Sequence, residues 1–166
     1  MKETLETIKD VLANMPNDAT GVRINRGWGI FYRLDELEKT SKFTIPHRYL
    51  RYRKAWVPVT IKSWKDFTED NQVMNAFNFR FFAHRQFFID LKGIAFTEKV
   101  INSVPDGATH YNFMSNMYYR NGNVFAEFWT DDHHLGWCES TMKNEEAERL
   151  LICLSDLTQK YNERCL

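Results

Sequence analysis

Residues 47–56 alternate cationic and aromatic side chains, a pattern typical of binding surfaces. In single-stranded nucleic-acid sites, cations pair with phosphates while rings stack on bases. Trp, Tyr and Arg also dominate the energetics of protein–protein contacts. The strip therefore has three interpretations: a nucleic-acid site, a protein contact, or a solvated edge strand whose arginines pack on its rings. The candidate binding residues of this strip are Arg48, Tyr49, Arg51, Tyr52, Arg53, Lys54 and Trp56.

A second candidate segment, Asp131-Asp132-His133-His134, is the densest set of potential metal ligands. Carboxylates and imidazoles together suit zinc or another divalent transition metal, so a metal-dependent hydrolase is one function that this segment allows. Neighbouring side chains on an extended segment point in opposite directions, however, and seldom reach one ion together. A polar loop is therefore the preferred interpretation, and we expect neither a bound metal nor a cofactor.

The sequence offers little for nucleophilic catalysis. It has no Gly-x-Ser-x-Gly elbow, phosphate loop, dinucleotide fingerprint or zinc-protease helix. Cys138 follows His133 and His134 closely, but nothing marks its thiol as activated. The cysteines Cys138, Cys153 and Cys165 are odd in number and widely spaced, which predicts reduced thiols rather than disulfides. An enzyme is thus a less favoured expectation than a non-catalytic protein.

Aromatic residues are abundant, with 13 Phe, 7 Tyr and 5 Trp among 166 residues. A ring-rich core would account for many of them. We nevertheless expect some rings on the surface, because large exposed apolar patches usually mark interaction sites. The candidate contacts for a protein partner outside the strip are Tyr118, Tyr119, Trp129 and Trp137.

Composition and charge exclude several classes of protein. With 43% apolar and 27% charged residues, the bulk of the chain is not disordered. Residues 21–65 carry eleven Lys and Arg against three acids, whereas residues 66–166 carry nine against fifteen. This asymmetry indicates a nucleic-acid surface or two mutually attracting parts of one chain.

No apolar run is long enough for a membrane helix, and the acidic start at Met1–Glu6 differs from a signal peptide, so we expect a cytoplasmic protein.

Apolar spacing in the first half predicts an amphipathic helix over Lys2–Met15, which Pro16 ends. Two short strands, Ala19–Asn25 and Trp28–Arg33, should form a hairpin around Arg26-Gly27. Residues 43–62 favour one or two strands. If the strip is one strand, Tyr49, Arg51 and Arg53 share a face.

Residues 63–91, in the middle of the chain, are rich in phenylalanine, and their pattern favours helical structure. Ser63 has an acid three residues later, as a helix start often has. Between Gln72 and Leu91 the apolar spacing fits either a helix or a strand, and a following Gly93 favours the helix because glycine commonly caps helix ends.

A short segment of the first half recurs 89 residues later. Met15-Pro16-Asn17-Asp18-Ala19-Thr20 aligns without gaps with Val104-Pro105-Asp106-Gly107-Ala108-Thr109. A helix precedes each copy, the second one capped by Thr97 and running through Val100 and Ile101, and a hairpin follows each copy. The sequence therefore predicts an internal duplication.

In the second copy, Asn121-Gly122 should join strands at residues 117–120 and 123–129. Leu135–Cys138 could add an edge strand. A long amphipathic helix is predicted from about Asn144 to Glu163, because its apolar residues recur at helical spacing.

Together these elements predict an α+β fold. Antiparallel hairpins come from two related helix-turn-hairpin halves, and the C-terminal amphipathic helix packs on the sheet. The length suits a single domain, residues 1–166, with pseudo-repeated halves at about 1–65 and 96–166. Residues 66–95 would form a Phe-rich connector.

The stretch from Val104 to Tyr111, with Tyr118-Tyr119, Phe128-Trp129 and Gly136-Trp137 after it, resembles a Pro-x-Gly-Ala-Thr-His-Tyr module. Small accessory proteins of tailed bacteriophages carry this module, and the resemblance covers roughly residues 96–138. The upstream copy departs from it, with Gly21-Val22 in place of His110-Tyr111. The resemblance implies a phage protein, active in the host cytoplasm, that binds and modulates a host protein in host takeover or anti-defence. It implies no catalytic residue.

Overall fold

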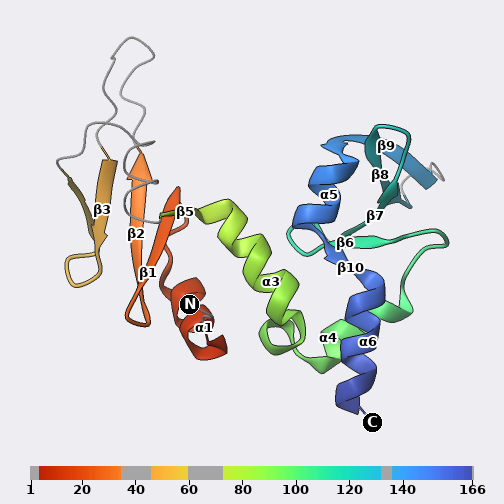
Figure 1. Cartoon of the computed structure of the whole chain (residues 1–166), viewed down its shortest axis with the longest axis horizontal. Helices are drawn as coiled ribbons and strands as arrows, with labels where there is room; N and C mark the ends of the chain where they lie inside the picture. Colours follow the sequence, from red (N-terminus) through yellow and green to blue (C-terminus); the bar gives the residue numbers. More distant parts are fainter. Residues whose placement is uncertain (1–3, 35–45, 60–72, 132–135, 166) are drawn as a thin grey trace. The chain divides into compact units, whose positions relative to one another are not determined.

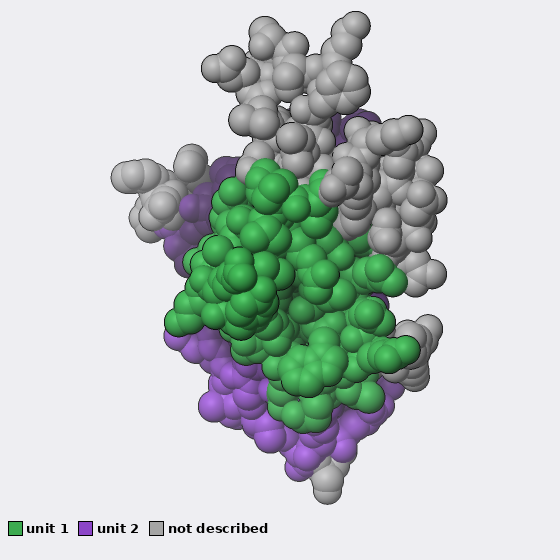
Figure 2. Space-filling view, turned by 90° about the vertical axis from the view of Figure 1, so that its left-hand side faces the viewer, with its two compact units in different colours: residues 1–80 green, residues 81–166 purple. Residues whose placement is uncertain are grey.

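The computed structural model describes residues 4–34, 46–59, 73–131 and 136–165. The described residues form an α+β fold with two antiparallel sheets of five strands each, as predicted. The chain divides into two compact units, Met1–Arg80 (unit 1) and Phe81–Leu166 (unit 2), which are coloured separately in Figure 2. A single domain with halves at 1–65 and 96–166 stays a prediction.

In the part that the structure describes, unit 1 consists of one helix and a five-stranded sheet, followed by the start of a further helix (Figure 1). The strand order is β4-β3-β2-β1-β5. The elements are α1 (Leu5–Asn14), β1 (Gly21–Asn25), β2 (Trp28–Leu34), β3 (Pro46–Leu50), β4 (Ala55–Pro58), β5 (Met74–Asn75) and α3 (Ala76–Lys92), which crosses into unit 2.

Helix α1 confirms the predicted N-terminal helix. Thr4 caps it, because its side chain accepts a hydrogen bond of 3.2 Å from the Thr7 amide. Its apolar face lies on β2 so closely that a Cβ added at Gly29 would lie 3.0 Å from Val11 Cγ2. The same Cβ would lie 2.9 Å from Phe31 Cζ, so a side chain at this position would require both neighbouring side chains to shift.

The β1–β2 hairpin is also confirmed. Asn25 pairs with Trp28, and the turn residues Arg26 and Gly27 both have positive φ, at 51° and 82°. This conformation matches the twist of antiparallel strands, and glycine adopts it without a steric penalty.

The basic and aromatic strip is a hairpin rather than the single strand that would place Tyr49, Arg51 and Arg53 on one face. Strand β3 ends at Leu50, and residues 51–54 turn back into β4. The Arg53 amide donates to the Leu50 carbonyl at 3.1 Å, and Lys54 takes a positive φ of 48°. The prediction that one strand would place Tyr49, Arg51 and Arg53 on one face is therefore wrong beyond Leu50. The chain turns back after this residue, and β4 pairs with β3.

Unit 2 contains the remainder of α3 and a second sheet with the strand order β10-β6-β7-β8-β9. Its further elements are α4 (Ile94–Asn102), β6 (His110–Asn112), β7 (Met117–Asn121), β8 (Phe125–Thr130), β9 (Gly136–Lys143), α5 (Asn144–Leu150), β10 (Ile152–Cys153) and α6 (Leu154–Cys165). Strand β9 is the edge strand predicted for this region.

The predicted helix from Asn144 to Glu163 is interrupted. Leu151 adopts an extended conformation after α5, and Ile152 then pairs with Tyr111 of β6. This short strand was missed because its pairing partner lies some 40 residues earlier, beyond any local pattern. The apolar face is nevertheless buried as predicted, since Leu154 and Leu157 of α6 pack with Tyr111.

Three other boundaries differ from the prediction. Helix α4 begins at Ile94 instead of Thr97, whose hydroxyl lies inside the helix and donates to the Gly93 carbonyl at 2.8 Å. The second hairpin turns through Gly122–Val124, a longer loop than Asn121-Gly122 alone. The predicted helix at 72–91 is confirmed as α3, but it begins only at Ala76, because Met74–Asn75 form strand β5. Ser63 lies outside the described residues.

The two sheets share one topology, which supports the predicted duplication. In each, a helix precedes four strands in simple antiparallel succession, and a fifth two-residue strand pairs with the first and leads into a helix. Thus β5 pairs with β1, and β10 pairs with β6.

Equivalent backbone hydrogen bonds extend this correspondence to single atoms. The turn after proline closes at 3.1 Å in both units, the following threonine amide donates at 2.9 Å, and its carbonyl accepts at 3.0 Å from the first helical residue. In unit 1 these bonds run from the amides of Ala19, Thr20 and Ala76 to the carbonyls of Pro16, Tyr32 and Thr20. In unit 2 they run, in the same order, from the amides of Ala108, Thr109 and Leu154 to the carbonyls of Pro105, Tyr119 and Thr109.

Candidate functional site

Among the described residues of unit 1, the most exposed rings lie at one end of the sheet. Because β2 and β3 are antiparallel, the β1–β2 and β3–β4 turns lie at the same end (Figure 1). Trp28 begins β2 and is 64% exposed, and Tyr52 in the second turn is 77% exposed. We call this surface the hairpin end. It comprises Arg26, Trp28, Arg51, Tyr52, Arg53 and Lys54.

The hairpin end is cationic. Arg26, Arg53 and Lys54 are exposed, and the Arg53 guanidinium carbon lies 5.4 Å from the centre of the Tyr52 ring. Such contacts stabilise weakly at exposed sites, by about 0.5–1 kcal/mol. They hold a cation beside a ring that remains accessible to a partner.

Arg51 lies beside the exposed Trp28 ring and joins the two turns. Its guanidinium carbon lies 5.9 Å from the Trp28 ring and 5.2 Å from the Phe31 ring. Its Nη2 donates to the Gly29 carbonyl at 3.3 Å and lies 3.5 Å from Asp10 Oδ2 of α1. The hairpin end is therefore tied to the strand and to the helix behind it.

The remaining rings of the strip pack against the sheet. Tyr49 and Trp56 are half-buried neighbours, with ring centres 5.2 Å apart. Trp56 Nε1 donates to Asp18 Oδ2 at 3.1 Å, and the same oxygen accepts from Arg33 at 2.8 Å. Arg33 also lies 5.0 Å from the Trp56 ring. We interpret the contacts among Asp18, Arg33 and Trp56 as packing at the edge of the sheet. Arg48 of the same strip is exposed.

Unit 2 repeats this arrangement of arginine and tryptophan. Arg120 lies 4.5 Å from the ring centre of Trp137, which contacts Trp129 at 5.4 Å. The acid that pairs with the arginine differs, because Glu127 on the neighbouring strand accepts from Arg120 Nε. Gly107 stands where the first copy has Asp18, and a Cβ there would lie 3.6 Å from Arg120 Nη1. The sequence repeat alone could not reveal this exchange of acids.

Tyr118 and Tyr119 belong to the packing of unit 2. Tyr118 is half-buried and donates its hydroxyl to the Val100 carbonyl at 2.7 Å. Tyr119 is buried with Ala126 and Leu150. A rigid partner would therefore reach neither ring as readily as Trp28 or Tyr52.

Only Asp131 of the proposed metal ligands is described. It is exposed and accepts a hydrogen bond of 2.8 Å from Trp129 Nε1. Asp132, His133 and His134 lie outside the described residues. Across the described part of the chain, no three His, Cys, Asp or Glu side chains are placed to hold a metal ion. The metal site stays a prediction.

His110 is a buried titratable group of unit 2. Its Nδ1 lies 2.9 Å from the Thr109 hydroxyl, and it stands opposite Cys153 and Tyr119 in the sheet. Burial lowers its pKa, an effect that Glu148 and Asp156 partly oppose and Arg85 reinforces. At neutral pH it is therefore an uncharged structural histidine.

This burial predicts a loss of stability in mild acid. Because the pKa of His110 is lower in the folded state, the unfolded state takes up the proton first as the pH falls below about 6.5. We expect the free energy of unfolding to fall between pH 7.5 and 5.5, and His110→Asn to make it less dependent on pH. Urea unfolding at both pH values measures this, and equal pH dependence in the two proteins would contradict it.

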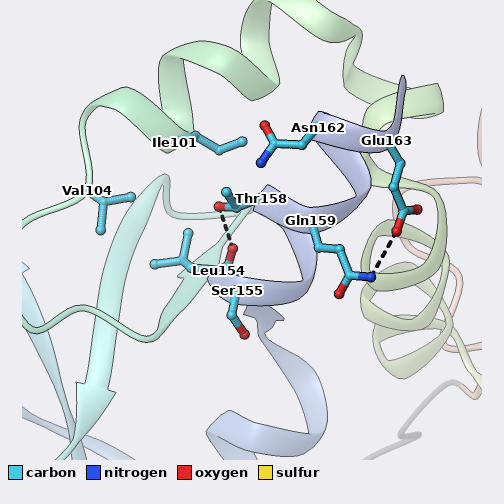
Figure 3. Close-up of a pocket in the computed structure, with 8 residues that line it drawn as sticks. All are labelled: Ile101, Val104, Leu154, Ser155, Thr158, Gln159, Asn162 and Glu163. Carbon is cyan, nitrogen blue, oxygen red and sulfur yellow. Dashed lines mark hydrogen bonds between the residues drawn. The ribbon is translucent and has the colours of Figure 1, made fainter. Parts of the chain in front are cut away.

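A groove of about 710 Å³ lies between α4 and α6 (Figure 3). Ile101, Val104 and Leu154 form its apolar side. On its polar side, Thr158 donates to the Leu154 carbonyl at 2.8 Å and Gln159 donates to Glu163 at 2.8 Å. These two side chains are therefore hydrogen-bonded within α6, and the Ser155 hydroxyl at the groove lies 3.1 Å from Cys153 Sγ.

Comparisons of the chain with protein-family models, with curated proteins and with solved structures gave no match. In the described part of the chain, none of the helices has the length and hydrophobicity that crossing a membrane requires.

Proposed function

We propose that this protein is a non-catalytic phage accessory protein that binds a host protein through the hairpin end and thereby modulates it. The observation that carries the proposal is the exposure of Trp28 and Tyr52 beside three exposed cations. Trp, Tyr and Arg are the residue types that contribute most to binding energy at protein interfaces. The partner surface should be acidic, with an apolar recess for the rings.

The distribution of charge favours a protein partner over nucleic acid. Unit 1 carries fourteen Lys and Arg against ten Asp and Glu, and unit 2 carries eight against twelve. Nucleic-acid-binding domains are usually strongly basic, with cations along a surface that follows the phosphates. A chain of zero formal net charge with the exposed cations Arg26, Arg53 and Lys54 at two turns fits an acidic patch on a protein better.

The phage origin and the role in host takeover or anti-defence rest on the resemblance of residues 96–138 to phage accessory proteins. A protein of this kind acts by occupying a surface of its target, which requires no catalytic group. Expression in the cytoplasm of the bacterial host would bring it to such a target.

Site-specific photo-crosslinking in host cells tests the proposal. A photoreactive amino acid at position 52 should yield one abundant adduct with a host protein. The same amino acid at position 124 should not, although Val124 is also 60% exposed. The purified proteins should then form a complex of fixed stoichiometry that changes the target's activity. If no adduct depends on position 52, or if the adduct protein does not bind in purified form, the proposal is wrong.

Single-stranded nucleic acid is the second candidate, favoured by the exposed Tyr52 ring with Arg53 beside it. This function predicts that the affinity for a 12-nucleotide thymidine oligonucleotide falls steeply with salt concentration. It also predicts that Arg51→Glu with Arg53→Glu abolishes binding. Fluorescence anisotropy from 50 to 300 mM salt measures both, and a flat salt response would eliminate this candidate.

A further inference from the structure

Arg51 uses few of the hydrogen bonds that its guanidinium can donate. Within the described residues, its hydrogen bonds come from Nη2 alone, at 3.3 Å to the Gly29 carbonyl and 3.5 Å to Asp10. Its Nε is buried and has no partner. Buried polar groups in proteins are nearly always paired, and arginine–carboxylate bonds are usually shorter, near 2.8 Å.

The surroundings of Arg51 point to an acceptor from outside the chain. The guanidinium lies against the rings of Phe31 and Trp28, and only about a third of its side chain is exposed. Neighbouring N–H groups of a guanidinium can bind both oxygens of a carboxylate once weaker contacts are exchanged, and such bidentate pairs are stronger and more specific than single contacts.

We propose that Arg51 is the anchor that receives a carboxylate of an acidic protein segment at the hairpin end. This inference rests on the proposed function and names the chemistry of the partner. The segment would place one Asp or Glu on Arg51, an apolar side chain on the Trp28 ring, and further acids near Arg53 and Lys54.

Asp10 occupies part of this position in the free protein. Its carboxylate is shared, because Oδ1 accepts from Asn14 at 2.9 Å while Oδ2 faces Arg51 at 3.5 Å. A long, half-exposed ion pair of this kind stabilises little. It is therefore readily exchanged, and Asp10 competes with the carboxylate of the partner.

The test uses the full-length protein and three fluorescein-labelled probes: the acidic peptide (Glu-Leu-Glu-Glu)3, the basic peptide (Lys-Leu-Lys-Lys)3 and a 12-nucleotide thymidine oligonucleotide. We expect only the acidic peptide to bind appreciably by fluorescence anisotropy. Arg51→Lys, which keeps the charge, should weaken binding about tenfold, since it removes the bidentate geometry. Asp10→Asn should tighten binding about threefold by removing the competitor.

Lys160→Met is the matched control, because it removes one exposed charge on α6 of unit 2 and should leave the affinity unchanged. Thermal melts establish that each variant is folded. No binding of the acidic peptide, equal binding by Arg51→Lys, or tighter binding of the oligonucleotide would overturn the inference. A host protein that crosslinks at position 52 but binds Arg51→Lys normally would leave the proposed function standing and refute the anchor alone.

Discussion

Replacing Trp28 and Tyr52 together with alanine should weaken binding of the host partner by at least about 100-fold. Each ring is more than half exposed in the free protein, so each has a large apolar surface that a partner can bury. Alanine substitution of such central aromatic residues typically costs about 2–4 kcal/mol each, and about 1.4 kcal/mol corresponds to a factor of ten. Titration calorimetry of the purified pair measures the affinity of both proteins.

The control for this result is a pair of exposed apolar residues elsewhere. Met114→Ala with Val124→Ala removes side chains that are similarly exposed in unit 2, and it should change the affinity less than about threefold. Equal losses in the two double variants would mean that the hairpin end has no special role. Both variants should melt close to the wild-type temperature, because neither removes a buried side chain.

Phe31→Ala should be among the most destabilising single changes in unit 1, lowering the free energy of unfolding by about 3–5 kcal/mol. Phe31 is fully buried, and its ring lies against the guanidinium of Arg51. Truncation would leave a cavity between α1 and the sheet, in addition to the lost transfer of the ring from water. Urea unfolding followed by far-ultraviolet circular dichroism measures the change.

Trp28→Ala serves as the comparison, since Trp28 lies in the same strand as Phe31 and is mostly exposed. It should cost less than about 1 kcal/mol, an amount typical of surface substitutions that lose one cation–π contact. If the two variants were equally unstable, the assignment of Phe31 to the core and Trp28 to the surface would be wrong.

The turns after Pro16 and Pro105 are the features that the sequence predicted best. Six aligned positions around Pro16 and Pro105 located a turn whose hydrogen bonds agree in length between the two units. Local chemistry explains this success, because proline, the small turn residues and threonine fix backbone conformation through neighbours only. The Arg26-Gly27 turn was predictable for the same reason.

Long-range pairing explains what the sequence did not predict. The β10 strand interrupts an otherwise perfect helical pattern because Ile152 and Cys153 complete a sheet edge formed by β6. There a tertiary contact outweighed the local helix preference. The return of the basic strip at Arg51–Lys54 follows instead from short-range pairing of β3 with β4, and its turn contains none of the Gly, Asn or Asp residues that usually mark a turn.

The sequence by itself determined the fold class, the order of helix, turn and hairpin after each proline, and the residue types available for binding. Composition and apolar spacing determine these features because they govern local backbone conformation. Only the tertiary structure decided which rings face solvent. It buried Tyr119, packed Trp56 against Arg33, and left Trp28 and Tyr52 outside, although all four are aromatic residues in or beside strands. Exposure depends on which elements cover each face of a sheet, and that covering is set by contacts between residues far apart in the chain.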